Sequence, residues 1–219
     1  MKRKAATPLN QTQYIKKPKI KKSLSLVNPP HASTSSIEKK NIDITTSFAL
    51  PAYGTWSGQN LLNALAQGAG SSSRIGRKVS MRSFLMRYSL QQPAQLPSLQ
   101  ARILIVYDKQ CNGAIPAITD ILNGSTAEAV NNLDKSDRFI TLVDYVTPEP
   151  GSNNAGDAAA QTFLYPAIYR KLNLETMYSG TAGTFAEIVT GALWLFVHSS
   201  ESTGTAQMFM STRVRYTDQ

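Results

Sequence analysis

The chain has 219 residues, 42% of them hydrophobic, and a formal net charge of +9 at pH 7. A chain of this length can bury a sizeable core, and its longest apolar run, Ala192–Val197, is too short for a membrane-spanning helix. Cys111 is the only cysteine, which excludes an intrachain disulfide and is compatible with a reducing compartment. We therefore expect one globular domain that does not insert into a membrane.

The positive charge is concentrated near the N-terminus. Residues 1–40 contain ten Lys or Arg and one acid, Glu38, whereas residues 41–219 contain thirteen basic and thirteen acidic residues. Four prolines and a Ser/Thr cluster at 33–36 accompany the basic residues, and a segment of this composition cannot bury a core. The sequence predicts a disordered basic arm over residues 1–40 and a folded domain over residues 41–219.

The arm has the chemistry of a nucleic-acid-binding segment. Clustered cations bind polyphosphate without reading base sequence, because the release of counterions drives the association. The two basic clusters, 2–4 and 16–22, are separated by eleven residues and also fit a bipartite nuclear-import signal. A solubility tail without a partner is the alternative interpretation. The residues predicted for nucleic-acid binding and for nuclear import are Lys2, Arg3, Lys4, Lys16, Lys17, Lys19, Lys21 and Lys22.

Short segments rich in β-branched and aromatic residues follow the arm, separated by Gly, Pro, Asn and Ser. This pattern is typical of an all-β sandwich or barrel. Two short helices, over 55–68 and 117–122, and two long connections, 108–136 and 147–161, complete the expected body. We expect eight strands, with a bend that divides 162–178 in two; the ranges are 41–50, 74–90, 101–107, 137–146, 162–178, 189–198 and 206–216.

The segment 74–90 changes its alternation part-way along. Val79 and Met81 share a face with Ile75, but from Phe84 onward the apolar residues occupy even positions. A strand keeps a period of two, so this change predicts a bulge or a bend. Basic residues lie on the other face of the first half, where phosphate or a neighbouring subunit could contact them; a solvated face balanced by acids is the alternative. This predicted basic row is Arg74, Lys78 and Arg82.

Two segments are apolar at nearly every position. They are RILIVY at 102–107 and ALWLFV at 192–197. Continuous apolar runs of this length, without alternation, predict strands that meet little solvent on either face.

Residues with catalytic or metal-binding chemistry are few and scattered. The two histidines, His31 and His198, have no metal-ligand spacing, and Cys111 has no histidine near it in the sequence. The glycines of GAGSSSRIGRKV at 68–79 do not have the spacing of a phosphate-binding loop. The sequence predicts no enzyme activity, no metal site and no cofactor.

Three stretches together suggest a family. QGAGSSSRIGRKVSMRSFLMRYSL (67–90), ARILIVYDKQCNGAIPAITDIL (101–122) and DRFITLVDY (137–145) resemble capsid proteins of circovirus-like viruses, whose circular single-stranded DNA genomes encode a replication initiator (CRESS-DNA viruses). In that family the RIGRK element begins a long strand, the VYDKQ element ends a strand and enters a surface loop, and RF opens the next strand. These elements lie here at 74–78, 106–116 and 138–139.

The resemblance implies an eight-stranded viral jelly roll that assembles with copies of itself into a small icosahedral shell of the T=1 type. It also implies that the arm binds the single-stranded DNA genome and that the protein occurs in the virion and, during assembly, in the host nucleus, reached through an import receptor. The connections 108–136 and 147–161 are then expected to carry subunit contacts or the outer surface. The residues at their roots, predicted as the subunit interface, are Tyr107, Asp108, Lys109 and Arg138.

A nucleic-acid-binding β-sandwich of non-viral origin, ribosomal or chromatin-associated, is the alternative function. Such proteins usually spread basic residues over the folded surface, whereas residues 41–219 of this chain are balanced in charge.

Overall fold

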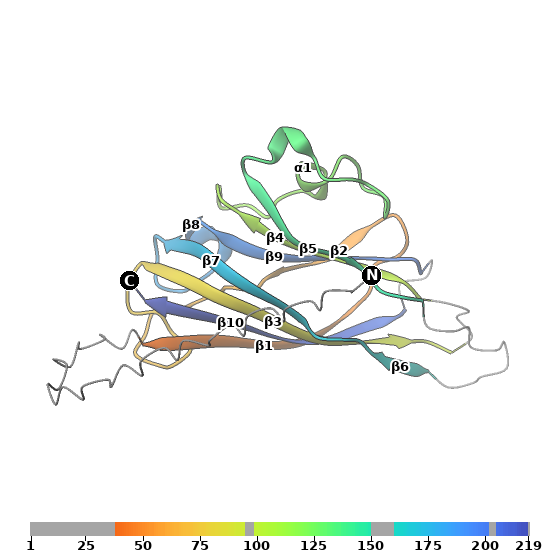
Figure 1. Cartoon of the computed structure of the whole chain (residues 1–219), viewed down its shortest axis with the longest axis horizontal. Helices are drawn as coiled ribbons and strands as arrows, with labels where there is room; N and C mark the ends of the chain where they lie inside the picture. Colours follow the sequence, from red (N-terminus) through yellow and green to blue (C-terminus); the bar gives the residue numbers. More distant parts are fainter. Residues whose placement is uncertain (1–37, 95–98, 150–159, 202–204, 219) are drawn as a thin grey trace, which may run out of the picture. The chain divides into compact units, whose positions relative to one another are not determined.

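The computed structural model describes residues 38–94, 99–149, 160–201 and 205–218 (Figure 1). These residues form ten strands, one helical turn and two short 3₁₀ turns. The strands are β1 (Lys39–Ala49), β2 (Trp56–Leu61), β3 (Lys78–Gln92), β4 (Ala101–Asp108), β5 (Phe139–Val146), β6 (Gln161–Leu164), β7 (Ile168–Tyr178), β8 (Ile188–Thr190), β9 (Ala192–Ser199) and β10 (Gln207–Asp218). The helical turns are α1 (Ile118–Ile121), η1 (Leu133–Lys135) and η2 (Phe185–Glu187).

The strands form two antiparallel sheets that face each other (Figure 1). One sheet has the order β1-β10-β3-β7-β8, with β6 paired to one end of β3, and the other has the order β2-β9-β4-β5. Neighbours within each sheet are mostly distant in sequence, as in the interleaved Greek keys of a jelly roll. The predicted eight-stranded jelly roll is therefore confirmed: its eight strands are β1, β10, β3 and β7 in one sheet and β2, β9, β4 and β5 in the other, with β6 and β8 as short additions. The bend expected within 162–178 is also present, because it separates β6 from β7.

A hydrophobic core lies on each side of β4 and β9, the central strands of the four-stranded sheet. All eight residues of each strand are buried. Side chains on one side of these strands, including Ile103 and Leu195, pack toward the six-stranded sheet. Side chains on the other side, including Leu104 and Phe196, form a second cluster with Ile121 of the β4–β5 connection. The predicted exclusion of solvent from both faces of these strands is confirmed.

The predicted irregularity in β3 is confirmed. The register with β7 shifts between Met81 and Ser83, and Met81 and Phe84, on either side of the shift, are both buried in the core. The predicted strand began too early, because β3 starts only at Lys78. Ile75 therefore precedes the strand, and 58% of its surface is exposed.

The helix predicted over 55–68 is wrong. Residues 56–61 instead form β2, which pairs with β9 at the edge of the four-stranded sheet. The buried Asn63 fixes the chain that follows: its side-chain oxygen accepts a hydrogen bond from Leu193 N (2.9 Å), and its amide nitrogen donates to Thr176 Oγ1 (2.9 Å) on β7. Pairing with a distant strand and a buried amide thus outweigh local helical spacing. The second predicted helix is present as the single turn α1.

The predicted arm lies outside the described residues except for its last three positions. Glu38 is described, and β1 begins at Lys39, two residues before the expected start of the folded domain. Part of the predicted connection 147–161 is also outside the described residues, which omit 150–159. No helix in the described parts of the chain is long and apolar enough to span a membrane.

Candidate nucleic-acid and assembly surfaces

The solvent side of the six-stranded sheet is rich in basic residues. Side chains of each strand alternate between the core and this side, so the buried Met210, Thr212 and Val214 of β10 separate exposed residues. We define the basic face by its basic residues on β1, β3, β7 and β10, which are Lys39, Lys78, Arg82, Arg87, Lys171, Arg213 and Arg215.

Acids on these strands are each paired with a cation. Asp43 accepts two hydrogen bonds from Arg213 (2.6 and 2.7 Å), and these bonds lower its pKa. Glu175 lies 2.8 Å from Lys78 Nζ, and Asp218 lies 3.0 Å from the buried Lys40 Nζ. In the described residues no ion pair remains for five cations of the basic face, which therefore carry unbalanced positive charge; they are Lys39, Arg82, Arg87, Lys171 and Arg215.

Four of these five cations surround one pocket of about 490 Å³, which we name the basic pocket. Arg215 and Lys171 both oppose Ser83 of β3, one on each side, and Arg82 is the extra residue of β3 at its bulge with β10. Neighbouring strands are about 5 Å apart, which places the backbones of Arg215 and Lys171 about 10 Å from each other. The residues that line the pocket are Lys39, Arg82, Ser83, Tyr169, Lys171, Leu172, Arg215, Tyr216 and Thr217.

The structure divides the predicted basic row. Arg82 lies exposed in the basic pocket, and Lys78 is on the same face but paired with Glu175. The prediction that Arg74 contacts phosphate is wrong, because its side chain is fully buried.

Arg74 instead holds three backbone segments together. Its Nε donates to Leu65 O (3.0 Å), its Nη1 donates to Gly76 O (2.7 Å) and its Nη2 donates to Gly180 O. The guanidinium also lies 4.3 Å from the centre of the Tyr178 ring. Arg74 is therefore a structural residue at the approach to β3.

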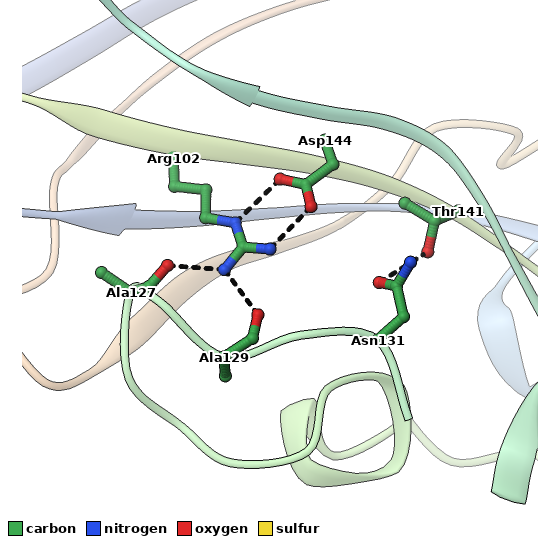
Figure 2. A network of polar contacts seen from close by, with 6 residues as sticks. All are labelled: Arg102, Ala127, Ala129, Asn131, Thr141 and Asp144. Carbon is green, nitrogen blue, oxygen red and sulfur yellow. Dashed lines mark hydrogen bonds and ion pairs between the residues drawn. The ribbon is translucent and has the colours of Figure 1, made fainter. Parts of the chain in front are cut away.

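The opposite side of the domain is covered by the β4–β5 connection, residues 109–138. Figure 1 shows this connection, with α1, on the side of the four-stranded sheet that faces away from the six-stranded sheet. Arg102 of β4 reaches into the connection: it forms a bidentate ion pair with Asp144 of β5 (2.6 and 2.8 Å) and donates to Ala127 O and Ala129 O (2.5 and 2.8 Å; Figure 2). Asn131 lies against Thr141 beside it (Figure 2). The connection is thus fixed to the sheet by specific polar contacts.

The predicted interface residues lie at the base of this connection, and most of them have partners within the chain. Asp108, 1% exposed, accepts two hydrogen bonds from Arg138 (2.8 and 2.9 Å), and the buried Tyr107 donates to Glu175 O (2.6 Å). The prediction that the side chains of Tyr107 and Asp108 contact neighbouring subunits is therefore wrong, because both are buried in the single chain. Arg138 is largely buried against Asp108, and Lys109 is half-buried.

The connection presents acids and apolar side chains to solvent. Its Val130 is 67% exposed and its Leu133 80% exposed. Apart from Arg138, which is paired with Asp108, the connection holds two basic residues, Lys109 and Lys135, against four acids. We name this surface the acidic loop; its acids are Asp120, Glu128, Asp134 and Asp137. Residues 41–219 are balanced in total charge, but their charges are separated in space. Basic side chains lie on the solvent side of the six-stranded sheet, and the acidic loop covers the four-stranded sheet.

The fold and this charge distribution can be compared with known families. Residues 16–219 match the model of the satellite tobacco necrosis virus coat protein family. The chain belongs to this family. No curated protein matches the chain. The family membership confirms the prediction of a viral capsid protein that is part of the virion and assembles with copies of itself into a shell.

A coat protein is a structural component, which agrees with the absence of predicted catalytic residues. Among the residues that the structure describes, no three His, Cys, Asp or Glu side chains are grouped so that they could hold a metal ion. The thiol of Cys111 lies near Asp108 O and Ala192 N, and burial raises its pKa.

Sequence reasoning missed most of the basic face. Lys39, Lys171 and Arg215 were not assigned to nucleic-acid binding, although a signal for one of them exists. In Gln207–Asp218 the apolar residues alternate with Arg213 and Arg215, which indicates a strand with one basic side. The assembly of four cations around one pocket depends on strand order, which no local pattern encodes.

Proposed function

We propose that this coat protein assembles into a small icosahedral shell of the T=1 type and packages single-stranded DNA through its basic arm. The observation that carries the proposal is the polarity of the folded domain. The arm continues directly into Lys39, which belongs to the basic face, while the acidic loop is on the other sheet. Negatively charged genome is attracted to the side with the arm and repelled by the other, so the basic face is the inner surface and the acidic loop the outer.

We also propose that the virus is circovirus-like. Support comes from two of the three motif stretches, which occupy the positions that the resemblance implies: VYD is the end of β4, and Phe139 opens β5. The RIGRK element lies mostly before β3 and joins the strand only at its last residue, Lys78. The family to which the chain belongs is named for a satellite virus coat protein. This name does not specify whether the packaged nucleic acid is DNA or RNA, so the experiment below identifies it directly.

Purified particles of the full chain test both parts. We expect electron microscopy to show uniform small shells, and we expect nucleic acid recovered after external nuclease treatment to be digested by a DNase specific for single strands. Recovery of RNA alone, from cells that also contain the viral DNA, would refute the DNA assignment. A full chain that stays monomeric at all salt and nucleic-acid concentrations would refute the shell.

Import into the host nucleus is a separate role proposed for the arm. A reporter fused to residues 1–40 is expected to accumulate in the nucleus, because the clusters at 2–4 and 16–22 fit an import receptor. Changing Lys16, Lys17, Lys19, Lys21 and Lys22 to Ala should return the reporter to the cytoplasm. Fluorescence microscopy measures both, and an intact fusion that remains cytoplasmic would leave packaging as the only role of the arm.

A further inference from the structure

We infer that the basic pocket binds a nucleotide of the packaged single-stranded nucleic acid: its cations hold the phosphate and Tyr169 stacks on the base. This inference rests on the proposed packaging function, but it adds a site on the folded domain to the arm. It thereby divides genome binding between electrostatic contacts made by the basic residues of the arm and one contact made by a pocket of the folded domain.

The cations of the pocket suit a phosphodiester. Arg82 and Arg215 present planar guanidinium groups, which can bind phosphate oxygens through two parallel hydrogen bonds, and Lys171 adds a point charge. In the described residues none of these three has an ion pair or a side-chain hydrogen bond to another group of the chain. Their donors are therefore available to a ligand without breaking a contact of the fold.

Tyr169 gives the pocket a surface for a base. It lines the pocket on β7, two residues before Lys171, and 48% of its surface is exposed. The two side chains project from the same side of the strand, because residues i and i+2 share a face. An exposed ring beside cations is the arrangement that binds single strands with little sequence preference. The pocket volume of about 490 Å³ lies within the range of about 300–1,000 Å³ common for small-molecule sites.

The position of the pocket favours nucleic acid over a second copy of the chain. Lys39 lines the pocket and is the first residue of β1, so the arm with its eight further cations is covalently joined at the rim. A strand that binds the arm is therefore held at high local concentration beside the pocket. The acidic loop of another copy could supply negative charge, but it would compete there with a polymer that the arm already binds.

A salt titration on dissociated full-length subunits tests the inference. We expect Arg82→Gln combined with Lys171→Gln to make the slope of log affinity against log salt shallower by about 1.4, since two phosphate contacts are lost on a single strand. The matched control is Lys109→Gln with Lys135→Gln, which removes the same charge from the other side of the domain and should leave the slope as in the wild type. The probes are oligo-dT and oligo-U, and circular dichroism checks that both variants are folded.

The contribution of Tyr169 is measured separately. Tyr169→Leu should weaken binding at least about 5-fold without changing the salt slope, because stacking involves no counterion release. The control is Tyr53→Leu, since Tyr53 is comparably exposed but lies outside the pocket. Photo-crosslinking with an oligonucleotide that contains 5-iodouracil should attach the base to Tyr169, as mapped by mass spectrometry.

The outcomes separate the pocket from the arm. If the pocket variant and its matched control have the same salt slope, the inference is overturned; loss of shells in that variant would then assign the pocket to a contact with a second copy. If substitution of the arm lysines leaves the slope unchanged while the pocket variant reduces it, the packaging role of the arm fails and the pocket remains.

Discussion

Full-length protein in which Lys16, Lys17, Lys19, Lys21 and Lys22 are changed to Gln is expected to lose a large part of the salt dependence of its binding to single-stranded DNA. Each phosphate contact contributes about −0.7 to the slope of log affinity against log salt, so the slope becomes shallower by about 3.5. Between 50 and 200 mM salt, the affinity of the variant should therefore fall by a factor roughly 100-fold smaller than that of the wild type. Fluorescence anisotropy with dissociated subunits measures this difference, because shell formation would add avidity.

A charge-conserving variant provides the control for this prediction. Changing the same five lysines to Arg keeps every positive charge and should keep the slope, because the contact with phosphate depends on charge more than on side-chain shape. Unrelated DNA sequences of equal length should bind both proteins with nearly equal affinity. A Gln variant with the wild-type slope would place the DNA site on the folded domain and contradict the arm as the packaging segment.

Local patterns in the sequence predicted much of the fold. Alternation and composition gave strands close to the observed ones, and the change of phase after Met81 located the bulge of β3 within two residues. These features depend on residues near each other in the chain, where the period of side chains records which face is buried. The helix expected over 55–68 failed because the spacing of Leu61, Leu62 and Leu65 suits a helical face as well as it suits an irregular buried segment.

The candidate sites were less predictable, because their contacts join distant parts of the chain. The sequence predicted that Arg74 is an exposed cation. Its side chain instead donates to the carbonyl groups of Leu65 and Gly180, and Gly180 is 106 residues away in the chain. The basic pocket combines residues of β1, β3, β7 and β10, which become neighbours only through the jelly-roll strand order. The pairing of Asp108 with Arg138 could have been anticipated, since an antiparallel β4–β5 pair brings the end of one strand beside the start of the next.

Arg138→Ala is expected to lower the free energy of unfolding by about 3 kcal/mol, because it leaves the Asp108 carboxylate buried without its cation. The hydrogen bonds that Arg138 donates to Asp108 raise the pKa of Arg138, and the guanidinium also lies 4.6 Å from the centre of the Phe139 ring. The pair closes the base of the acidic loop, where Lys109 N donates to Arg138 O (2.9 Å). Urea unfolding of dissociated subunits, followed by circular dichroism, measures the loss.

Two further variants show whether Arg138 stabilises the fold or contacts another subunit. Asp108→Asn combined with Arg138→Ala should be more stable than Arg138→Ala alone, because no charge is then left buried, and Lys135→Ala on the exposed turn of the same connection should change stability by less than about 0.5 kcal/mol. Assembly should decline in proportion to stability, since a loosened loop base displaces Val130 and Leu133, exposed apolar residues of the same acidic loop. A different outcome would contradict this structural role. If Arg138→Ala subunits keep wild-type stability but fail to form shells, Arg138 contacts a neighbouring subunit, as the sequence predicted.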